Sequence, residues 1–287
     1  MSLSLNGSPE LGNAVFLDHV NFPVTDHRLA TLFFIEGLGF TRDPYRNVGT
    51  ANMWVNVGTQ QFHLPIGRPL PFSGEVAIAV PDLTELAGRL GAIAGGLEGS
   101  EYSCAEDGEC LRIVDPWGRR LRAYRAGALP GRNPLALPYV EFWVASGAAA
   151  GIADFYRRVI GAPAELSEEG GEPTAHVFVG PHQTLRYREK RDAEPSGHVL
   201  HVCLYLTHFW EIYEAMRELD IVHEEVANEQ FRFCDLSAPQ GAPQGASSNW
   251  PLYSIEHEMR SVYHLDYRRP LVNRIAMANE PGYVAPR

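Results

Sequence analysis

VNFPV, at residues 20–24, is the stretch that decides the fold, because it places apolar side chains at every second position. The same alternation returns as VAIAV at 76–80, VEFWV at 140–144 and VCLYL at 202–206. A period of two is typical of a half-buried β-strand, and each copy is followed by apolar residues at helical spacing. Internal repetition of this kind predicts a fold built from four copies of one unit.

Each repeat opens a unit with the same order of elements. In the first unit, a strand at 16–24 is followed by a helix from Asp26 that two glycines stop, and then by three short strand-like segments. The other units begin with Glu75, Tyr139 and His201. We therefore predict an α+β fold of four βαβββ modules.

A segment rich in Pro and Gly, GALPGRNPLALP at 127–138, interrupts the pattern between the second and third units. It predicts two domains of two modules each, at 14–126 and 138–270. A second biased tract, at 237–250, is expected to form an exposed, mobile loop, and the tail after Arg274 is expected to be poorly ordered.

Composition narrows the range of partners. The 287 residues include 35 acidic and 24 basic side chains, for a net charge of -11, which repels phosphate backbones and anionic lipid. Neither an apolar run of about 18 residues nor a secretory signal is present. We therefore expect a cytoplasmic protein that binds neither nucleic acid nor membrane. The four cysteines are too scattered for a disulfide framework and are expected to be reduced thiols.

Strand parity indicates where polar side chains gather. His19 and Asn21 share one face of the first strand, and Gln61 and His63 share one face of the last strand of the first unit. Buried polar groups are costly unless they are satisfied. Such a face is either a wet functional site or a satisfied hydrogen-bond network.

The four units, GLGF at 37–40 and DPWGRRL at 115–121 together resemble the vicinal oxygen chelate superfamily, over about residues 14–270. This group contains glyoxalase I, extradiol ring-cleaving dioxygenases, and bleomycin and fosfomycin resistance proteins. The resemblance implies two glyoxalase-like domains with curled mixed sheets. In each, two units pair into a cup that holds a divalent metal on their first and last strands.

Carried over to this chain, the resemblance implies His19, His63 and Glu75 as metal ligands in the amino-terminal cup. Arg122 stands where the family usually has a glutamate. A set of two histidines and one carboxylate accepts Fe, Mn, Zn or Ni, and no organic cofactor is expected. Arg122 is then a catalytic candidate that clamps an oxyanion of the substrate. Alternatively, Arg122 pairs with Glu75 across the cup and no metal binds.

The second predicted cup presents Glu141 and His201 on its inner face. Burial shifts the pKa of such groups toward neutrality, which makes them candidates for a catalytic acid and base. The alternative is that this aromatic and polar face is a pocket wall or an interface.

Two functions follow from the sequence. The first is a metal-dependent lyase, isomerase or dioxygenase that acts on a small substrate with vicinal oxygens. The second is a metal-free protein of the bleomycin-resistance type, which binds or sequesters a small molecule. Both predict a small-molecule ligand and a monomer or homodimer, because four units already supply the sheet pairing that two-unit relatives obtain by dimerising.

Overall fold

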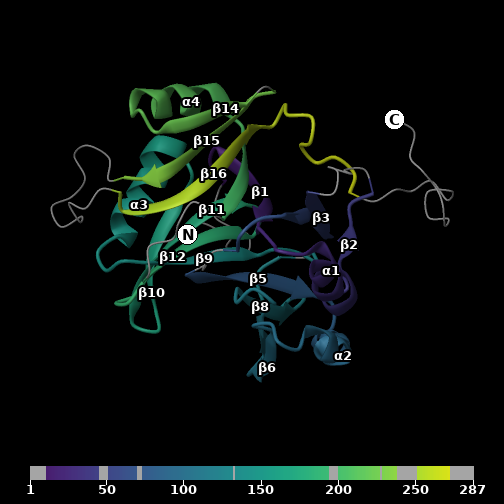
Figure 1. Ribbon diagram of the computed structural model, residues 1–287. Coiled ribbons are helices and arrows are strands. Elements are labelled where there is room, and N and C mark those ends of the chain that lie inside the picture. Colours follow the sequence, from purple (N-terminus) through teal and green to yellow (C-terminus); the bar gives the residue numbers. More distant parts are fainter. Residues whose placement is uncertain are drawn as a thin grey trace.

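The computed structural model describes residues 11–44, 51–69, 73–131, 133–193, 200–226, 228–237 and 251–271. Within these residues the four predicted units are present, each with a strand, a helical segment and three further strands (Figure 1). The α+β fold of four βαβββ modules is therefore confirmed. Most of the biased tract at 237–250, and the tail after Arg274, lie outside the described residues.

The elements have the following bounds. The first unit consists of β1 (Ala14–Asn21), α1 (His27–Ala30), the π-helical η1 (Thr31–Gly37), β2 (Thr41–Arg42), β3 (Asn52–Val57) and β4 (Gln60–Pro65). The second consists of β5 (Gly74–Val80), α2 (Leu83–Ile93), the 3-10 helix η2 (Ala94–Leu97), β6 (Ser103–Asp107), β7 (Cys110–Val114) and β8 (Arg120–Arg125). The third consists of β9 (Tyr139–Val144), α3 (Ala149–Phe155), the π-helical η3 (Tyr156–Ile160), β10 (Ala164–Glu169), β11 (Glu172–Gly180) and β12 (Gln183–Glu189). The fourth consists of β13 (His201–Leu206), α4 (Phe209–Glu218), β14 (Val222–Val226), β15 (Gln230–Leu236) and β16 (Tyr253–Ser261).

Local chemistry explains where the helices begin and end. The side chains of Asp26 and Asp82 accept backbone N–H groups at the first turns of α1 and α2, which satisfies donors that have no partner within the helix. Gly161 ends the helix of the third unit with a left-handed φ of 72°. A residue without a Cβ adopts this conformation at little cost.

The strands form two eight-stranded sheets. One has the order β14-β15-β16-β13-β1-β4-β3-β2, and the other has the order β10-β11-β12-β9-β5-β8-β7-β6. The first unit therefore shares a sheet with the fourth, and the second shares a sheet with the third. At each centre, two first strands pair antiparallel, β1 with β13 and β5 with β9.

This pairing corrects the expectation that units one and two form one cup and units three and four the other. The segment at 127–138 joins β8 to β9, and its Ala136 bridges to Ala79 on β5. The first strands of the second and third units are therefore neighbours, and those of the first and fourth units pair with each other. The domain ranges 14–126 and 138–270 stay a prediction, and each sheet takes strands from both.

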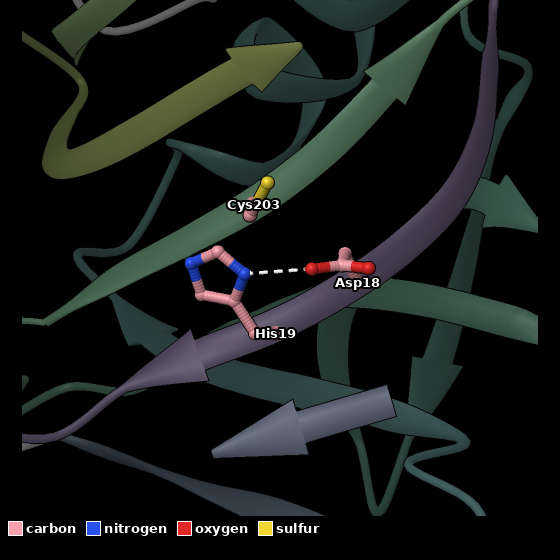
Figure 2. Close-up of side chains that lie close together, drawn as sticks. All are labelled: Asp18, His19 and Cys203. Atoms are coloured by element: carbon pink, nitrogen blue, oxygen red, sulfur yellow. Dashed lines mark hydrogen bonds and ion pairs between the residues drawn. The ribbon is translucent and has the colours of Figure 1, made fainter. Parts of the chain in front are cut away.

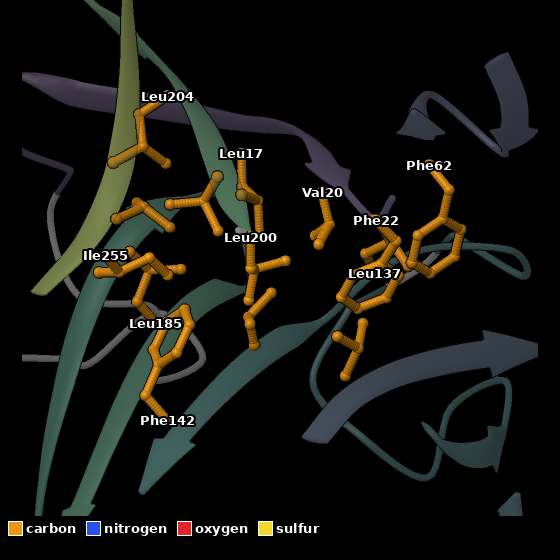
Figure 3. Packing of buried hydrophobic residues seen from close by; sticks show 14 of the residues in the cluster. Leu17, Val20, Phe22, Phe62, Leu137, Phe142, Leu185, Leu200, Leu204 and Ile255 are labelled. Carbon is orange, nitrogen blue, oxygen red and sulfur yellow. The ribbon is translucent and has the colours of Figure 1, made fainter. Parts of the chain in front are cut away.

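The core lies between elements of both sheets. Leu17, Leu204 and Ile255 from one sheet pack in the same cluster as Phe142 and Leu185 from the other (Figure 3). Each of these side chains is almost fully buried. No helix in the described part of the chain is long and apolar enough to cross a bilayer.

The last strand of the fourth unit runs without a break from Tyr253 to Ser261. This strand, β16, pairs along its length with β13 on one side and β15 on the other. After β16 the chain crosses from the fourth unit toward β2 and β3 of the first unit (Figure 1). We call this segment, residues 262–271, the strap.

Candidate functional site

Three histidines and one glutamate meet on one face of the sheet that contains β1. His19 lies on β1, His63 on β4, His201 on β13 and Glu258 on β16. The rings of His19 and His63 stack with centroids 3.6 Å apart, and the Nε2 atoms of His19 and His201 lie 3.1 Å apart. All four side chains are buried. We call these four residues the histidine cluster.

The strand alternation and one irregularity of β1 position these side chains. His63 follows Phe62, whose ring faces the core, so the histidine faces the opposite side. The register between β1 and β13 shifts between Leu17 and His19, which indicates a β-bulge at Asp18. Bulges commonly occur next to functional sites, because the extra residue re-aims the side chains beside it.

Two carboxylates hold the outer nitrogens of the imidazole rings. Asp18 Oδ2 lies 2.8 Å from His19 Nδ1 (Figure 2), and Glu256 Oε1 lies 3.1 Å from His201 Nδ1. An ionised carboxylate only accepts hydrogen bonds, so each Nδ1 carries a hydrogen, and in the neutral ring Nε2 carries a lone pair. Two lone pairs therefore face each other across 3.1 Å. This arrangement calls for a proton or a cation between them.

Glu258 supplies a charge beside this pair of nitrogens. Its carboxylate oxygens lie 3.9 Å from His19 Nε2 and 3.5 Å from His201 Nε2. Burial opposes the ionised form, but the charges of His19, Arg260, His201 and Arg232 outweigh it and lower the pKa of Glu258. Burial lowers the pKa of His19 and lowers that of His63 further below its usual value. The ionised carboxylate of Glu258 is the form that binds a metal ion.

The donor set fits a divalent ion. Nitrogen ligands at about 2.1 Å from one ion lie roughly 3.0 to 3.4 Å from each other. The contacts of 3.1, 3.5 and 3.9 Å among His19, His201 and Glu258 are close to this spacing. Oε1 of Glu258 is also buried without a hydrogen-bond donor, although Arg260 Nη2 lies within ion-pair distance at 2.6 Å.

A second group of potential ligand atoms shares His19 with the first. Asp18, His19 and Cys203 lie close together where β1 and β13 pair (Figure 2). Burial raises the pKa of the Cys203 thiol well above its usual value. Because the thiolate is the form that binds metals, the group with Glu258 is the better donor set.

The structure does not bring Glu75 together with the two predicted histidine ligands. Glu75 lies on β5 in the other sheet, where its carboxylate is 3.1 Å from Arg122 Nε and accepts a hydrogen bond of 2.7 Å from Tyr139. Neither Glu75 nor His63 belongs to a group of convergent ligand atoms among the described residues. The separation follows from the sheet order, because the second unit pairs with the third. The ion pair of Arg122 with Glu75, considered above as the metal-free alternative, is present.

Glu141 and His201 are also separated, on β9 and β13 of different sheets. Glu141 forms an ion pair of 2.9 Å with Arg188. Burial nevertheless raises the pKa of Glu141, and the neighbouring charge of Glu75 adds to the rise. The catalytic roles predicted for Arg122 and Glu141 stay predictions for the sheet of the second and third units.

Sequence reasoning missed Glu258, because the tract before it leaves the register of the last strand open. The signal was present in IEHEMR at 255–260. Ile255 and Met259 are buried in the core, whereas Glu256 and Glu258 alternate with them and face the histidines. The alternation of glutamates with core residues along this strand is the feature that identifies Glu258 as the fourth member of the histidine cluster.

The strap covers the histidine cluster. Arg269 forms an ion pair with Asp43, Asp266 lies 3.6 Å from Arg260, and Asn56 donates a hydrogen bond of 2.8 Å to the carbonyl of Leu271. A space of about 10 Å³ remains under the strap, beside Trp54 and Gln61.

Solved structures with the same fold include two enzymes or enzyme-like proteins. The chain is similar to glyoxalase I from Zea mays, with 13% identity, a TM-score of 0.59 and coverage of 85% of this chain and 92% of that one. It is also similar to a putative dioxygenase from Bacillus subtilis, with 11% identity, a TM-score of 0.54 and coverage of 87% and 86%. No family model and no curated protein matches the sequence.

Proposed function

We propose, from the premise that this chain has the fold of the vicinal oxygen chelate superfamily, that it is a metal-dependent enzyme of the glyoxalase or dioxygenase type. Its substrate is a small molecule with two adjacent oxygens. The proposed site is the histidine cluster, which the first and fourth units build together.

One observation carries this proposal. The Nε2 atoms of His19 and His201 face each other at 3.1 Å, and a carboxylate beside each Nδ1 fixes the lone pairs inward. We propose that His19, His201 and Glu258 hold a divalent ion, with His63 stacked against His19 as a neighbouring donor. Such an ion acts as a Lewis acid toward vicinal oxygens of a substrate.

The residues around the ligands have their own roles in this proposal. Asp18 and Glu256 orient the two rings and keep their hydrogens on Nδ1, as carboxylates behind metal-bound histidines commonly do. Trp54 stacks on His63 at a centroid distance of 3.8 Å and shields this side of the cluster from water. A dry site strengthens the electrostatic interactions inside it.

Metal analysis of the purified protein tests the proposal. We expect about one divalent ion per chain in protein prepared without chelator, or after Fe(II), Mn(II), Zn(II) and Ni(II) are offered in turn. The variants His201→Ala and Glu258→Gln should lose the ion. The matched variant Glu75→Gln removes a half-buried carboxylate that also pairs with an arginine, and should retain the ion. Wild-type protein that stays empty with every metal contradicts the proposal.

A metal-free binding protein is the second candidate function, and a specific observation favours it. Arg232 Nη2 and Arg260 Nη2 lie 2.7 and 2.6 Å from the two oxygens of Glu258, so protein cations already neutralise this carboxylate. A shared proton can then satisfy His19 and His201. This candidate predicts thermal stability that is unchanged when chelator or metal is added, whereas the metalloenzyme gains stability on binding its ion.

A further inference from the structure

A cavity of about 950 Å³ lies beside the strap, outside the histidine cluster. Its walls come from the β3–β4 turn, the β11–β12 turn, the linker at 127–138 and the strap. Volumes of about 300 to 1,000 Å³ are typical of small-molecule sites. The cavity is thus large enough for a ligand, and no role described above uses it.

Apolar side chains and backbone form most of the cavity wall. Phe16, Leu129, Ala136 and Leu137 line it together with several prolines and glycines. Gly58 packs so closely on the linker that a Cβ there would lie 2.0 Å from the carbonyl oxygen of Leu135. This contact, with the left-handed φ of 65° at Gly58, fixes the β3–β4 turn against the linker and keeps the wall in place.

The charged groups that line the cavity are basic. Arg268, Arg269 and His182 contribute to the wall, and none of the described lining residues is an aspartate or glutamate. This is unusual in a chain with a net charge of -11. Arg269 pairs with Asp43, whereas no carboxylate in the described part of the chain forms an ion pair with Arg268. The exposed Arg268 guanidinium lies 6.0 Å from the ring centre of Tyr267 and remains available to an anion.

We infer that this cavity binds a small, largely apolar molecule that carries a carboxylate or a similar anionic group. The apolar part lies against Phe16, Ala136 and Leu137, and the anionic group pairs with Arg268 on the strap. The cavity and the small space under the strap share Thr59, Arg268, Arg269 and Leu271. The ligand therefore lies directly beside the segment that covers the histidine cluster.

Three ten-carbon probes that differ only in their head group test this inference. Calorimetry measures the binding of decanoate, 1-decanol and decylammonium to the full chain. Chelator is present in every titration, so the binding measured does not depend on whether a probe removes a metal ion. We expect decanoate to bind tightest and decylammonium weakest. Equal binding of the three probes, or no binding of decanoate up to its solubility limit, overturns the inference.

Two variants locate the site. Arg268→Gln should weaken decanoate binding about twofold to fivefold, as loss of an exposed ion pair does, and should leave 1-decanol unchanged. Arg217→Gln is the matched control, because Arg217 is also exposed and lies 5.7 Å from the ring centre of Tyr213. The ring introduced by Ala136→Phe occupies part of the cavity against its apolar wall, so this variant should weaken binding of both probes in protein with an unchanged circular dichroism spectrum. Decanoate binding that neither Arg268→Gln nor Ala136→Phe alters overturns the assignment.

A second copy of the chain is the competing occupant. Sedimentation of the wild type with and without decanoate distinguishes the two. A dimer that does not bind decanoate and keeps its sedimentation coefficient when decanoate is added overturns the inference, whereas decanoate binding, with or without dissociation of a dimer, supports it. Metal analysis of the same samples reports separately on the proposed enzyme site.

Discussion

Arg269 on the strap forms an ion pair with Asp43, a residue of the first unit whose side chain is completely buried. The same carboxylate accepts a hydrogen bond of 2.7 Å from Gln61, which in turn contacts His63. This pair joins the end of the described chain to its beginning across the histidine cluster.

The variant Asp43→Asn should therefore loosen the strap. Arg269 keeps its ion pair of 3.4 Å with Asp266, so we expect the loss of the buried partner to cost about 1 to 3 kcal/mol. We expect lower thermal stability and faster carbethoxylation of His63, measured by mass spectrometry of its peptide. Asp107→Asn, which alters the more exposed pairs with Arg112 and Arg122, should change neither quantity much. Unchanged protection of His63 in Asp43→Asn contradicts the role of the strap as a cover.

Stability should fall as the solution is acidified below neutrality, and His257 contributes to this. Burial lowers the pKa of His257 to about 4, although a hydrogen bond to the carbonyl of Ile255 partly opposes the shift. A histidine whose pKa is lower in the folded state stabilises the fold above its unfolded pKa of about 6.5, and this contribution is lost between about 6.5 and 4. Between pH 7 and pH 5 the loss is about 2 kcal/mol.

Urea unfolding of wild type and His257→Gln at both pH values measures this contribution. The variant is destabilised at pH 7, because His257 stacks on Phe233 and bonds to Tyr156. Its stability should nevertheless depend less on pH than that of the wild type. An equal pH dependence in the two proteins contradicts the assignment to His257. The lowered pKa values of His19 and His63 act in the same direction and remain in the variant.

The DPWG turn contains a buried ion pair that should contribute strongly to stability. Asp115 Oδ2 lies 2.6 Å from Arg119 Nε, and Arg119 Nη1 donates to the carbonyl of Pro23 in the first unit. Asp115→Ala should lower the free energy of unfolding by about 3 to 5 kcal/mol, because Arg119 is then buried without its partner. Chemical denaturation measures this loss.

The control for this prediction is Glu85→Ala on α2. Glu85 and Arg89 have the same i, i+4 spacing as Asp115 and Arg119, but both side chains are largely exposed. Exposed pairs of this kind contribute about 0.3 to 0.5 kcal/mol. If Asp115→Ala and Glu85→Ala lower the free energy of unfolding by similar amounts, burial does not explain the strength of the pair between Asp115 and Arg119.

Gln183 should be important for the contact between the two sheets. From the start of β12 its side chain accepts a hydrogen bond from the backbone N–H of Leu17 and donates one to the carbonyl of the same residue. Gln183→Ala leaves the buried N–H of Leu17 without this acceptor, at about 1 to 3 kcal/mol, whereas the carbonyl of Leu17 keeps the hydrogen bond from Gln60 Nε2. The expected fall in thermal stability should exceed that of Thr184→Ala, the neighbouring half-buried position. Equal effects of the two substitutions contradict this role.

How much of the fold was predictable depends on the range of the interactions. The alternation beginning at Val76, Val140 and Val202 predicted the first strands of the last three units, because strand periodicity is a local property, whereas the stretch at 20–24 overlaps only the end of β1, which stops at Asn21. The same parity predicted that His19 and His63 share a face, and their rings do stack. The sequence could not show which unit pairs with which, because an antiparallel pairing such as β1 with β13 is decided by contacts between residues far apart in the chain.

The sequence by itself determined the number of units, their order of elements and the polar face that carries the histidines. Only the tertiary structure decided the composition of the site. It placed Glu258 with His19 and His201 and left Glu75 with Arg122, because the first unit pairs with the fourth. Periodicity along one strand determines the direction of a side chain, whereas the residues it meets depend on the hydrogen bonding of strand edges about 180 residues apart.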